Sequence, residues 1–412
     1  MTYRKEKLGV MIEEEIGTQR GSEDTFRVVT ILLLFIIAVA LVSFGESLYP
    51  ASLSLFLNES GIPVAEIGVF FTAFFAASAL IAIPAGYISD RLGRNIIIVF
   101  LFALTVTVFS YSLADTGGEL LLLRAVHGAA AAPIFLIARA YIMDKTTKKN
   151  RGRIMGTFGL LTGAAGIVAP TFGDSLRDQT GGFNPLFYTA AIFPVIAAIL
   201  LLIVFKDMRK GFTAQKMMQP HRKLFSNRSF IVILVMFAVL YFASSILSPI
   251  MPIFAVRELG MSYTQLASLS LYIGIFYAAS AFMGGVLSDF FGRKNLLVYP
   301  LIIYAAAVFV AGLSVNYQMF FDAYILVAIG AAPYVVVAYS LIGDVVEQEH
   351  RGTACGVVAL INALSGVAGP PLGSAIGEVV GLQIPFFVCS LMVGLTAVML
   401  FFVLPQDKDV AA

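Results

Sequence analysis

The sequence predicts an all-α membrane protein of twelve transmembrane helices, arranged as two pseudo-symmetric six-helix bundles. Of its 412 residues, 59% are hydrophobic and only 13% are charged, whereas a soluble globular domain carries roughly a quarter of charged residues. Charge this scarce cannot cover a surface in water, so the apolar surface is expected to face lipid. A helix needs roughly 20 apolar residues to cross a hydrocarbon core about 30 Å thick, and runs of that length recur along the chain.

Glycine, proline and charged residues divide the apolar runs into six spans in each half. The first six are expected at residues 27–52, 64–89, 95–114, 119–142, 154–176 and 184–205. The second six are expected at residues 229–256, 263–288, 295–314, 319–342, 353–377 and 384–404. The remaining segments are an N-terminal tail (1–26), a charged linker (206–228) and a C-terminal tail (405–412). The two bundles are therefore expected at 27–205 and 229–404.

Basic residues gather in alternate loops between the predicted spans. One set of loops holds the linker's seven lysines and arginines together with Arg91, Arg94, Lys145, Lys148, Lys149, Arg151, Arg153, Arg293, Lys294 and Arg351. The opposite loops hold only Arg177 and Arg257. Since positive charge is retained on the cytoplasmic side, the linker and both termini are expected to be cytoplasmic, in a multi-pass protein of the plasma membrane.

The two halves repeat one another at a nearly constant shift. The segment Gly86-Tyr-Ile-Ser-Asp90-Arg-Leu-Gly93-Arg94 recurs 199 residues later as Gly285-Val-Leu-Ser-Asp289-Phe-Phe-Gly292-Arg293. A shift of 200 residues relates Asp144 to Asp344 and Pro170-x-x-Gly173 to Pro370-x-x-Gly373. Repetition of two six-helix halves predicts a pseudo-twofold axis along the membrane normal, with a solute site between the halves near the midplane.

These residues resemble the major facilitator superfamily from about Phe26 to Leu404. The family's loop motif Gly-x-x-x-Asp-Arg-x-Gly-Arg stands intact at Gly86, Asp90, Arg91, Gly93 and Arg94, and its second copy keeps Gly285, Asp289, Gly292 and Arg293. The resemblance implies that Asp144, and Asp344 in the repeat, joins each cluster at the end of the following long helix. The hypothesis is a conformational latch that holds the cytoplasmic side shut; the alternative is a static loop brace.

Two further segments resemble signatures of proton-coupled drug exporters within the family. Arg124-Ala-Val-His-Gly128 resembles their Arg-x-x-x-Gly, and Glu46-Ser-Leu-Tyr-Pro50 resembles an acidic residue four positions before a proline. The antiporter motif Gly-Pro-x-x-Gly-Gly reads Ala169-Pro170-Thr171-Phe172-Gly173-Asp174, and the other half carries Gly369-Pro370-Pro371-Leu372-Gly373. We expect these last two segments to pack helices together.

Glu46 and Arg124 are the candidate proton-coupling residues. A charge at the bilayer centre costs at least about 2.5–3.5 kcal/mol, so such side chains usually pair and face the protein interior. A rise of about 1.5 Å per residue places both in the outer half of their helices, where an ion pair is possible. In the functional hypothesis Glu46 takes and releases the proton while Arg124 favours its ionised form. The alternatives are a structural buried pair, or a Glu46 in contact with water. His127 is either a third titrating group or a satisfied core histidine.

Other residues are candidates for a solute cavity. Arg139 shares a helix face with Arg124, with mostly small residues between them, which predicts a cavity wall; the alternative is that Arg139 extends to the membrane surface. At the positions 200 residues further on stand Tyr324 and Tyr339. They predict an aromatic surface for an organic solute in the second half, which Tyr241, Tyr272 and Tyr334 would extend. Core packing is the alternative for each tyrosine.

The expected function is secondary active transport by alternating access, with proton-coupled efflux of amphipathic compounds as the leading mechanism. The alternatives are uptake of a sugar, organic acid or other nutrient, and, more remotely, a membrane sensor that does not transport. An enzyme is not expected, because only one of the three histidines lies in an apolar run and no nucleophile–base set is visible. No nucleotide-binding loop is present, so the proton gradient is the expected energy source. We expect no cofactor, metal or nucleic-acid partner, and a monomer.

Overall fold

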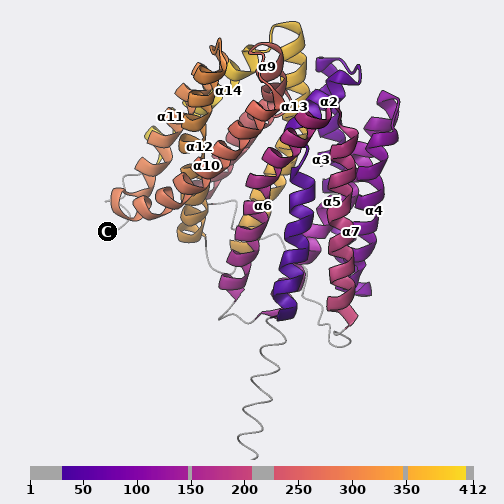
Figure 1. Ribbon diagram of the computed structural model, residues 1–412. Helices are drawn as coiled ribbons and strands as arrows, with labels where there is room; N and C mark the ends of the chain where they lie inside the picture. Colours follow the sequence, from indigo (N-terminus) through magenta and orange to yellow (C-terminus); the bar gives the residue numbers. More distant parts are fainter. Residues whose placement is uncertain (1–29, 147–150, 207–226, 347–350, 405–412) are drawn as a thin grey trace, which may run out of the picture.

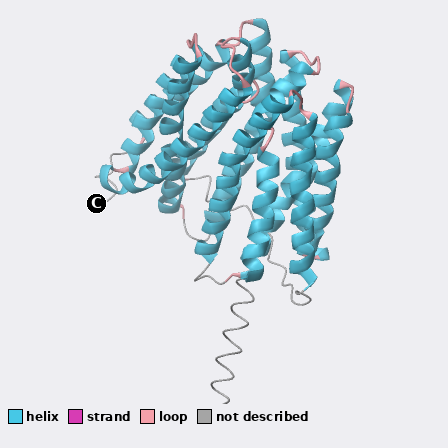
Figure 2. Cartoon of the chain, viewed as in Figure 1, coloured by secondary structure: helices cyan, strands magenta, loops and turns pink. Residues whose placement is uncertain are grey.

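The computed structural model describes residues 30–146, 151–206, 227–346 and 351–404 (Figure 1). Within these ranges the regular secondary structure is helical throughout (Figure 2), so the predicted all-α class is confirmed. Eleven of the described helices are long and apolar enough to cross a membrane. A further helix, α6, has 30 residues, and at about 1.5 Å per residue it is also long enough to do so.

Each half of the described chain crosses the molecule six times, and some of these spans are divided into shorter helical segments. The first half contains a helix at Thr30–Ser47, then α2 (Pro50–Glu59), α3 (Val64–Leu92), η1 (Arg94–Ile96), α4 (Ile97–Ser110), η2 (Tyr111–Leu113), α5 (Gly117–Lys145), α6 (Arg151–Thr180) and α7 (Asn184–Lys206). The second half contains α8 (Arg228–Leu247), α9 (Ile250–Arg257), α10 (Tyr263–Phe291), α11 (Arg293–Gly312), α12 (Tyr317–Val345), α13 (Arg351–Val379) and α14 (Ile384–Val403).

The first span of each half is interrupted, which the hydropathy pattern did not indicate. The span expected at 27–52 ends as a helix at Ser47 and resumes as α2 at Pro50. The span expected at 229–256 is divided at Ser248 and Pro249 into α8 and α9. A proline lacks the backbone N–H that continues a helix and is favoured at a helix start. The same kind of interruption therefore appears in both halves.

Polar side chains fix where several helices begin. Thr116 and Glu119 form a capping box at the start of α5, and Ser262 and Gln265 form one at the start of α10. Such caps satisfy backbone N–H groups that have no partner within the helix. Each of these two long helices begins just after a short loop.

The two bundles meet along two seams, α3 against α13 and α6 against α10. We call the end of the molecule where α7 ends and α8 begins the linker end, and the end that carries α2 and α9 the far end (Figure 1). The seam contacts lie toward the far end: Thr72 Oγ1 donates to the carbonyl of Val367 at 2.6 Å, and Thr171 Oγ1 donates to that of Ala267 at 3.2 Å.

Toward the linker end the same helix faces separate. One or more turns beyond the seam contacts, the side chains that continue these faces are exposed; they are Ala79, Leu160, Ala278 and Ala359. Leu160, which lies two turns from the buried contact between Ile167 and Gly274, is 71% exposed. The bundles are therefore closed against each other at the far end and open at the linker end, as their splayed lower ends in Figure 1 also show.

Candidate functional site

Five polar side chains form one connected set inside the first bundle. Glu46 lies in the last turn of the first helix, Tyr49 in the interruption that follows, and Tyr111 at the start of η2. Arg124 and His127 lie three residues apart on α5, so they share one face of that helix. Chain segments from three parts of the first half thus meet at one point.

The contacts of this set centre on His127. Its Nε2 atom lies 2.9 Å from Glu46 Oε2, and its Nδ1 atom lies 3.2 Å from both Arg124 Nη1 and the Tyr111 hydroxyl. The Tyr49 hydroxyl donates to Glu46 Oε1 at 2.9 Å. His127 is only 1% exposed, whereas the Glu46 side chain is 15% exposed. Glu46 is therefore the member of this pair that is more accessible from outside the bundle.

The hydrogen-bond pattern assigns the tautomer of His127. An arginine side chain only donates hydrogen bonds, so Nδ1 of His127 accepts from Arg124 and carries no proton. The proton of the neutral ring is then on Nε2, where it donates to the carboxylate of Glu46. With Glu46 ionised and Arg124 positive, the set has no net charge, and the histidine transmits the effect of the guanidinium to the carboxylate.

Gly128 explains how Arg124 is held. A Cβ atom at position 128 would lie 2.1 Å from the carbonyl oxygen of Phe74, so only glycine permits this approach of α5 to α3. The approach places the Arg124 guanidinium over the Phe74 ring, 4.5 Å from its centroid. Arg124 is 5% exposed, and the stacked ring contributes a cation–π interaction in place of water.

The sequence placed Glu46 and Arg124 at depths that permit an ion pair, and the structure places His127 between them. Tyr49 and Tyr111 were not predicted as members of the set. Tyr49 could have been predicted, because it follows Glu46 by three residues and so lies near it on a helix. Tyr111 could not, because its approach depends on the packing of η2.

The second half has no equivalent of this set. At the positions shifted by 200 residues stand Ile246 for Glu46, Ala311 for Tyr111 and Val327 for His127. Only Tyr324, in place of Arg124, keeps a polar atom. Although the backbone repeats, the charged members of the set, Glu46 and Arg124, have no charged counterpart at these positions.

The residues predicted to line a solute cavity differ in their exposure: some are accessible and others are buried. Arg139 on α5 is exposed, and Tyr272 and Tyr339 are 45% and 38% exposed. Tyr324 and Tyr334 are buried in the second bundle, where Tyr324 packs on Phe320 with ring centroids 4.7 Å apart. Tyr241 is half-buried and stacks on Phe237 at 5.3 Å. In this conformation, therefore, Tyr324 and Tyr334 belong to the core.

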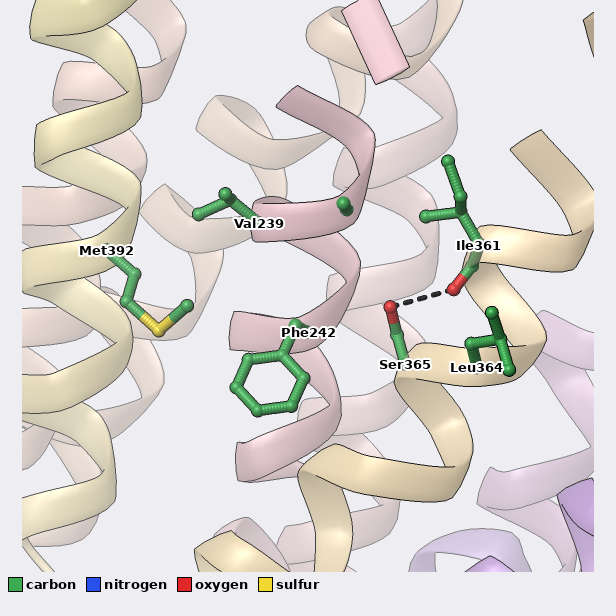
Figure 3. Close-up of a pocket in the computed structure, with 7 residues that line it drawn as sticks. Val239, Phe242, Ile361, Leu364, Ser365 and Met392 are labelled. Atoms are coloured by element: carbon green, nitrogen blue, oxygen red, sulfur yellow. Dashed lines mark hydrogen bonds between the residues drawn. The ribbon is translucent and has the colours of Figure 1, made fainter. Parts of the chain in front are cut away.

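A cavity of about 390 Å³ lies elsewhere in the second bundle, between α8, α13 and α14. Its lining is almost wholly apolar: Ala238, Val239, Phe242, Ile361, Leu364, Ser365 and Met392. The one polar group, the Ser365 hydroxyl, turns back to the Ile361 carbonyl at 2.8 Å (Figure 3). None of the five predicted tyrosines lines this cavity, which offers dispersion contacts rather than hydrogen bonds.

The loop motif forms an ion-pair cluster within each bundle. Arg94 donates to Asp90 at 2.6 Å and to Asp144 at 2.9 Å, which ties the loop after α3 to the end of α5. In the repeat, Arg293 donates to Asp344 at 2.8 Å. The side chain of Asp289 lies outside the described residues.

The backbone conformation of the motif explains the glycines at positions 93 and 292, and the ion pairs described above each join residues of one bundle. Gly93 and Gly292 adopt φ values of 94° and 83°, which favour glycine. A Cβ at Gly86 would lie 3.7 Å from Leu136 on α5, and one at Gly285 would lie 3.3 Å from Val336 on α12. Arg91 stacks on Tyr87, 4.5 Å from the ring centroid. In this open state the ion pairs join helices within each bundle, and the roles as a latch or as a brace both stay predictions.

The two Pro-x-x-Gly segments pack against the helix interruptions. A Cβ at Gly173 would lie 1.9 Å from the carbonyl oxygen of Leu48, and one at Gly373 would lie 2.0 Å from that of Ile246. Ala169 is fully buried, and Gly369 faces Ser245 in the second half. Pro170 and Pro370 lie inside α6 and α13. Each segment thus brings a seam helix into backbone contact with the interrupted helix of its own bundle.

Carboxylates at the far end connect the bundles, and the sequence analysis did not identify them. Glu59 accepts from Arg177 at 2.9 Å within the first bundle and from the Tyr263 hydroxyl of α10 at 2.5 Å. Asp178 accepts from the hydroxyl of Thr264, also on α10. These hydrogen bonds close the far end across the seam.

Comparison with known proteins identifies relatives over most of the chain. The family model described as Major Facilitator Superfamily matches residues 35–243 and 233–412. Multidrug resistance protein 1 of Bacillus subtilis (strain 168) is 24% identical over 80% of this chain and 85% of its own length. Quinolone resistance protein NorA of Staphylococcus aureus (strain COL) is 19% identical over 90% of this chain and 95% of its own.

Solved structures show the same fold. A bacterial homologue of the human lysosomal transporter Spinster, in an inward-facing and occupied conformation, superposes with a TM-score of 0.74 at 19% identity, over 90% of this chain and 96% of the other. The human organic anion transporter MFSD10 superposes with a TM-score of 0.64 at 16% identity, over 90% of this chain and 99% of the other. These similarities extend across both bundles.

Proposed function

Because this chain belongs to the major facilitator superfamily, we propose that it exports amphipathic small molecules in exchange for protons. The observation that carries the proposal is the buried set in which His127 links Glu46 to Arg124. Relatives named for multidrug and quinolone resistance support the same direction of transport.

Glu46 takes up the coupled proton in this proposal. Its carboxylate accepts from both His127 and Tyr49, and its partial exposure makes it the point of entry. A proton that bonds to one of its oxygens removes one acceptor and leaves the set with a net positive charge. A buried positive charge without a counter-charge is costly, so the protonated set and a cationic solute nearby disfavour one another. That mutual exclusion is the basis of exchange.

Tyr49 couples the protonation of Glu46 to the conformation of the protein. This residue lies in the interruption between the first helix and α2, and its hydroxyl donates to Glu46. Charge-assisted hydrogen bonds are stronger than neutral ones, so protonation of Glu46 loosens the interruption. α2 contacts α9 of the other bundle. A conformational change at the interruption therefore affects the contact between the bundles at the far end.

The solute enters in the conformation that is open at the linker end, and the basic loops support a cytoplasmic position for that end. Exposed surfaces of α3, α6, α10 and α13 face this opening, and the apolar cavity in the second bundle offers contacts for a hydrophobic portion of the solute. Closure of the linker end and opening of the far end then release the solute outside, as alternating access requires.

The direction of coupling is tested in proteoliposomes of known orientation with an imposed pH gradient. A panel of aromatic cations and neutral amphipathic compounds is supplied on one side, and both solute and proton movements are recorded. Solute movement opposite to proton movement is the expected result. Movement of solute and proton in the same direction would instead establish uptake, and solute movement that ignores the pH gradient would exclude proton coupling.

A further inference from the structure

Asp174 is a buried carboxyl group that the mechanism above does not use. It stands on α6 and is 0% exposed. The hydroxyl of Ser52, on α2, donates to its Oδ1 atom. Its Oδ2 atom is buried and has no hydrogen-bond partner among the described residues. Asp174 takes the place of the last glycine in the antiporter motif, so a packing motif alone does not account for it.

The surroundings of Asp174 do not compensate a negative charge in this conformation. No ion pair joins Asp174 to any cation within the described part of the chain. An ionised carboxylate removed from water and held by one hydroxyl is strongly disfavoured, and such groups are neutralised instead. Asp174 is therefore a neutral acid while the far end is closed.

A cation lies one turn away but is held elsewhere. Arg177 follows Asp174 by three residues on α6, which puts the two on the same face within reach of each other. In this structure the guanidinium is paired with Glu59 and lies against the rings of Phe183 and Tyr263, 4.5 and 4.6 Å from their centroids. Its Nε atom is buried without a partner in the described residues.

Tyr263 makes this arrangement depend on the far end being closed. It belongs to α10 in the second bundle, and it both stacks on Arg177 and donates to Glu59. Separation of α10 from α6 removes the Tyr263 ring from Arg177 and the Tyr263 hydroxyl, a hydrogen-bond donor, from Glu59. The guanidinium is then free to turn toward the carboxyl group of Asp174, and water reaches both.

We propose that Asp174 is a proton-binding switch for the far end, protonated when that end is closed and ion-paired with Arg177 when it is open. On opening, the O–H bond of the acid breaks, the proton passes to water, and the carboxylate pairs with Arg177. On closing, a proton from the far side returns to Asp174 and frees Arg177 for Glu59 and Tyr263. The inference rests on alternating access but not on proton-coupled export, because this proton returns to the side from which it came.

The groups that face Asp174 set the sign of the pH dependence. They are Ser52 and Glu59 on α2, Arg177 and Asp178 on α6, and Tyr263 on α10. Because the closed state holds one more proton than the open state, acid favours closure and alkali favours opening. One proton changes the ratio of closed to open by at most about tenfold per pH unit.

The test follows closure of the far end directly, with no solute, on full-length protein that carries Glu46→Gln. Ser60→Cys and Glu258→Cys, both exposed near the far end on opposite bundles, receive spin labels in a background free of other cysteines. Distances between the labels are recorded across a range of pH. We expect acid to shorten the distance, and we expect Asp174→Asn to remain closed at every pH. Asp115→Asn, a change at an exposed aspartate at the same end of the molecule, is the control and should retain the pH dependence.

An unchanged pH dependence in Asp174→Asn would overturn the proposal, as would its loss in Asp115→Asn. The infrared spectrum supplies a second readout: a band of protonated carboxylic acid should be present at acid pH, fade at alkaline pH and be absent from Asp174→Asn. If that variant does not fold, Asp174→Glu keeps the carboxyl group and shifts the frequency of its band. A band that does not shift in Asp174→Glu would contradict the assignment. Because Glu46 is absent throughout, failure here leaves proton-coupled export untouched.

Discussion

His127 Nε2 lies 2.9 Å from Glu46 Oε2, while its Nδ1 lies 3.2 Å from Arg124 Nη1. The histidine therefore stands between the two charges of the first bundle, and each of its ring nitrogens has a defined role. This relationship makes the state of Glu46 depend on the hydrogen bond that it accepts from His127. The same ring also connects the first helix to α5.

Replacement of His127 should therefore destabilise the protein as well as uncouple it. His127→Phe leaves donors of Arg124 and Tyr111 and the carboxylate of Glu46 without their buried partner, at a cost of about 1–3 kcal/mol for each unsatisfied group. Tyr111→Phe removes one hydrogen bond of the same set and should cost only about 0.5–1.5 kcal/mol. Thermal unfolding of the purified variants measures the difference. Equal stability of the two variants would mean that the ring is not the bridge.

Much of the fold could be predicted from the sequence because it depends on local features that recur along the chain. The apolar runs, the repeat and the glycine-rich loop at Gly93 each depend on local composition, and these gave the helical spans and the loop geometry. The interruption before Pro50 was missed because hydropathy does not change across it. The place of His127 was missed because helix periodicity gives the direction of a side chain but not its partner on another helix.

The two motif glycines at the interruptions should not tolerate a methyl group. Gly173→Ala and Gly373→Ala place a Cβ atom at 1.9 and 2.0 Å from the carbonyl oxygens of Leu48 and Ile246, so the helices must separate. Overpacking of this kind costs about 1–3 kcal/mol. Gly163→Ala on α6, where a Cβ meets nothing within 4 Å, is the matched control and should be neutral or stabilising by about 0.5–1 kcal/mol. Melting temperatures in one detergent compare the three variants. Loss of stability in the control alone would refute this explanation of the motif.

Two of the predicted tyrosines should differ in what their removal affects. Tyr339 is 38% exposed and Tyr324 is buried, so Tyr339→Ala should change apparent affinity among aromatic and cationic solutes with little loss of stability. Tyr324→Ala opens a cavity beside Phe320 and should cost about 3–5 kcal/mol, as large aromatic truncations do. Binding across several solutes and thermal unfolding separate the two effects. An affinity change in Tyr324→Ala without loss of stability would show that this residue contacts the solute in another state.

Asp90→Asn should slow transport more than it destabilises the protein. Asp90 is 44% exposed, and Arg94 keeps Asp144 as a partner, so the expected loss of stability is at most about 1 kcal/mol. If the loop cluster acts as a latch in the state that is closed at the linker end, turnover should fall while solute binding is retained. The transport rate and the solute affinity are both measured in proteoliposomes. Normal turnover would leave the cluster as a brace within its bundle.

Transport by the variant Glu46→Gln is the decisive measurement for the proposal that Glu46 carries the coupled proton. Glutamine keeps the shape and the acceptor for Tyr49 but cannot titrate, so we expect that a pH gradient no longer drives uphill solute movement while exchange of solute at equilibrium persists. Glu119→Gln, an exposed carboxylate that caps α5, is the control, since glutamine also completes a capping box, and it should transport normally. Uphill transport by Glu46→Gln on a proton gradient would contradict the account.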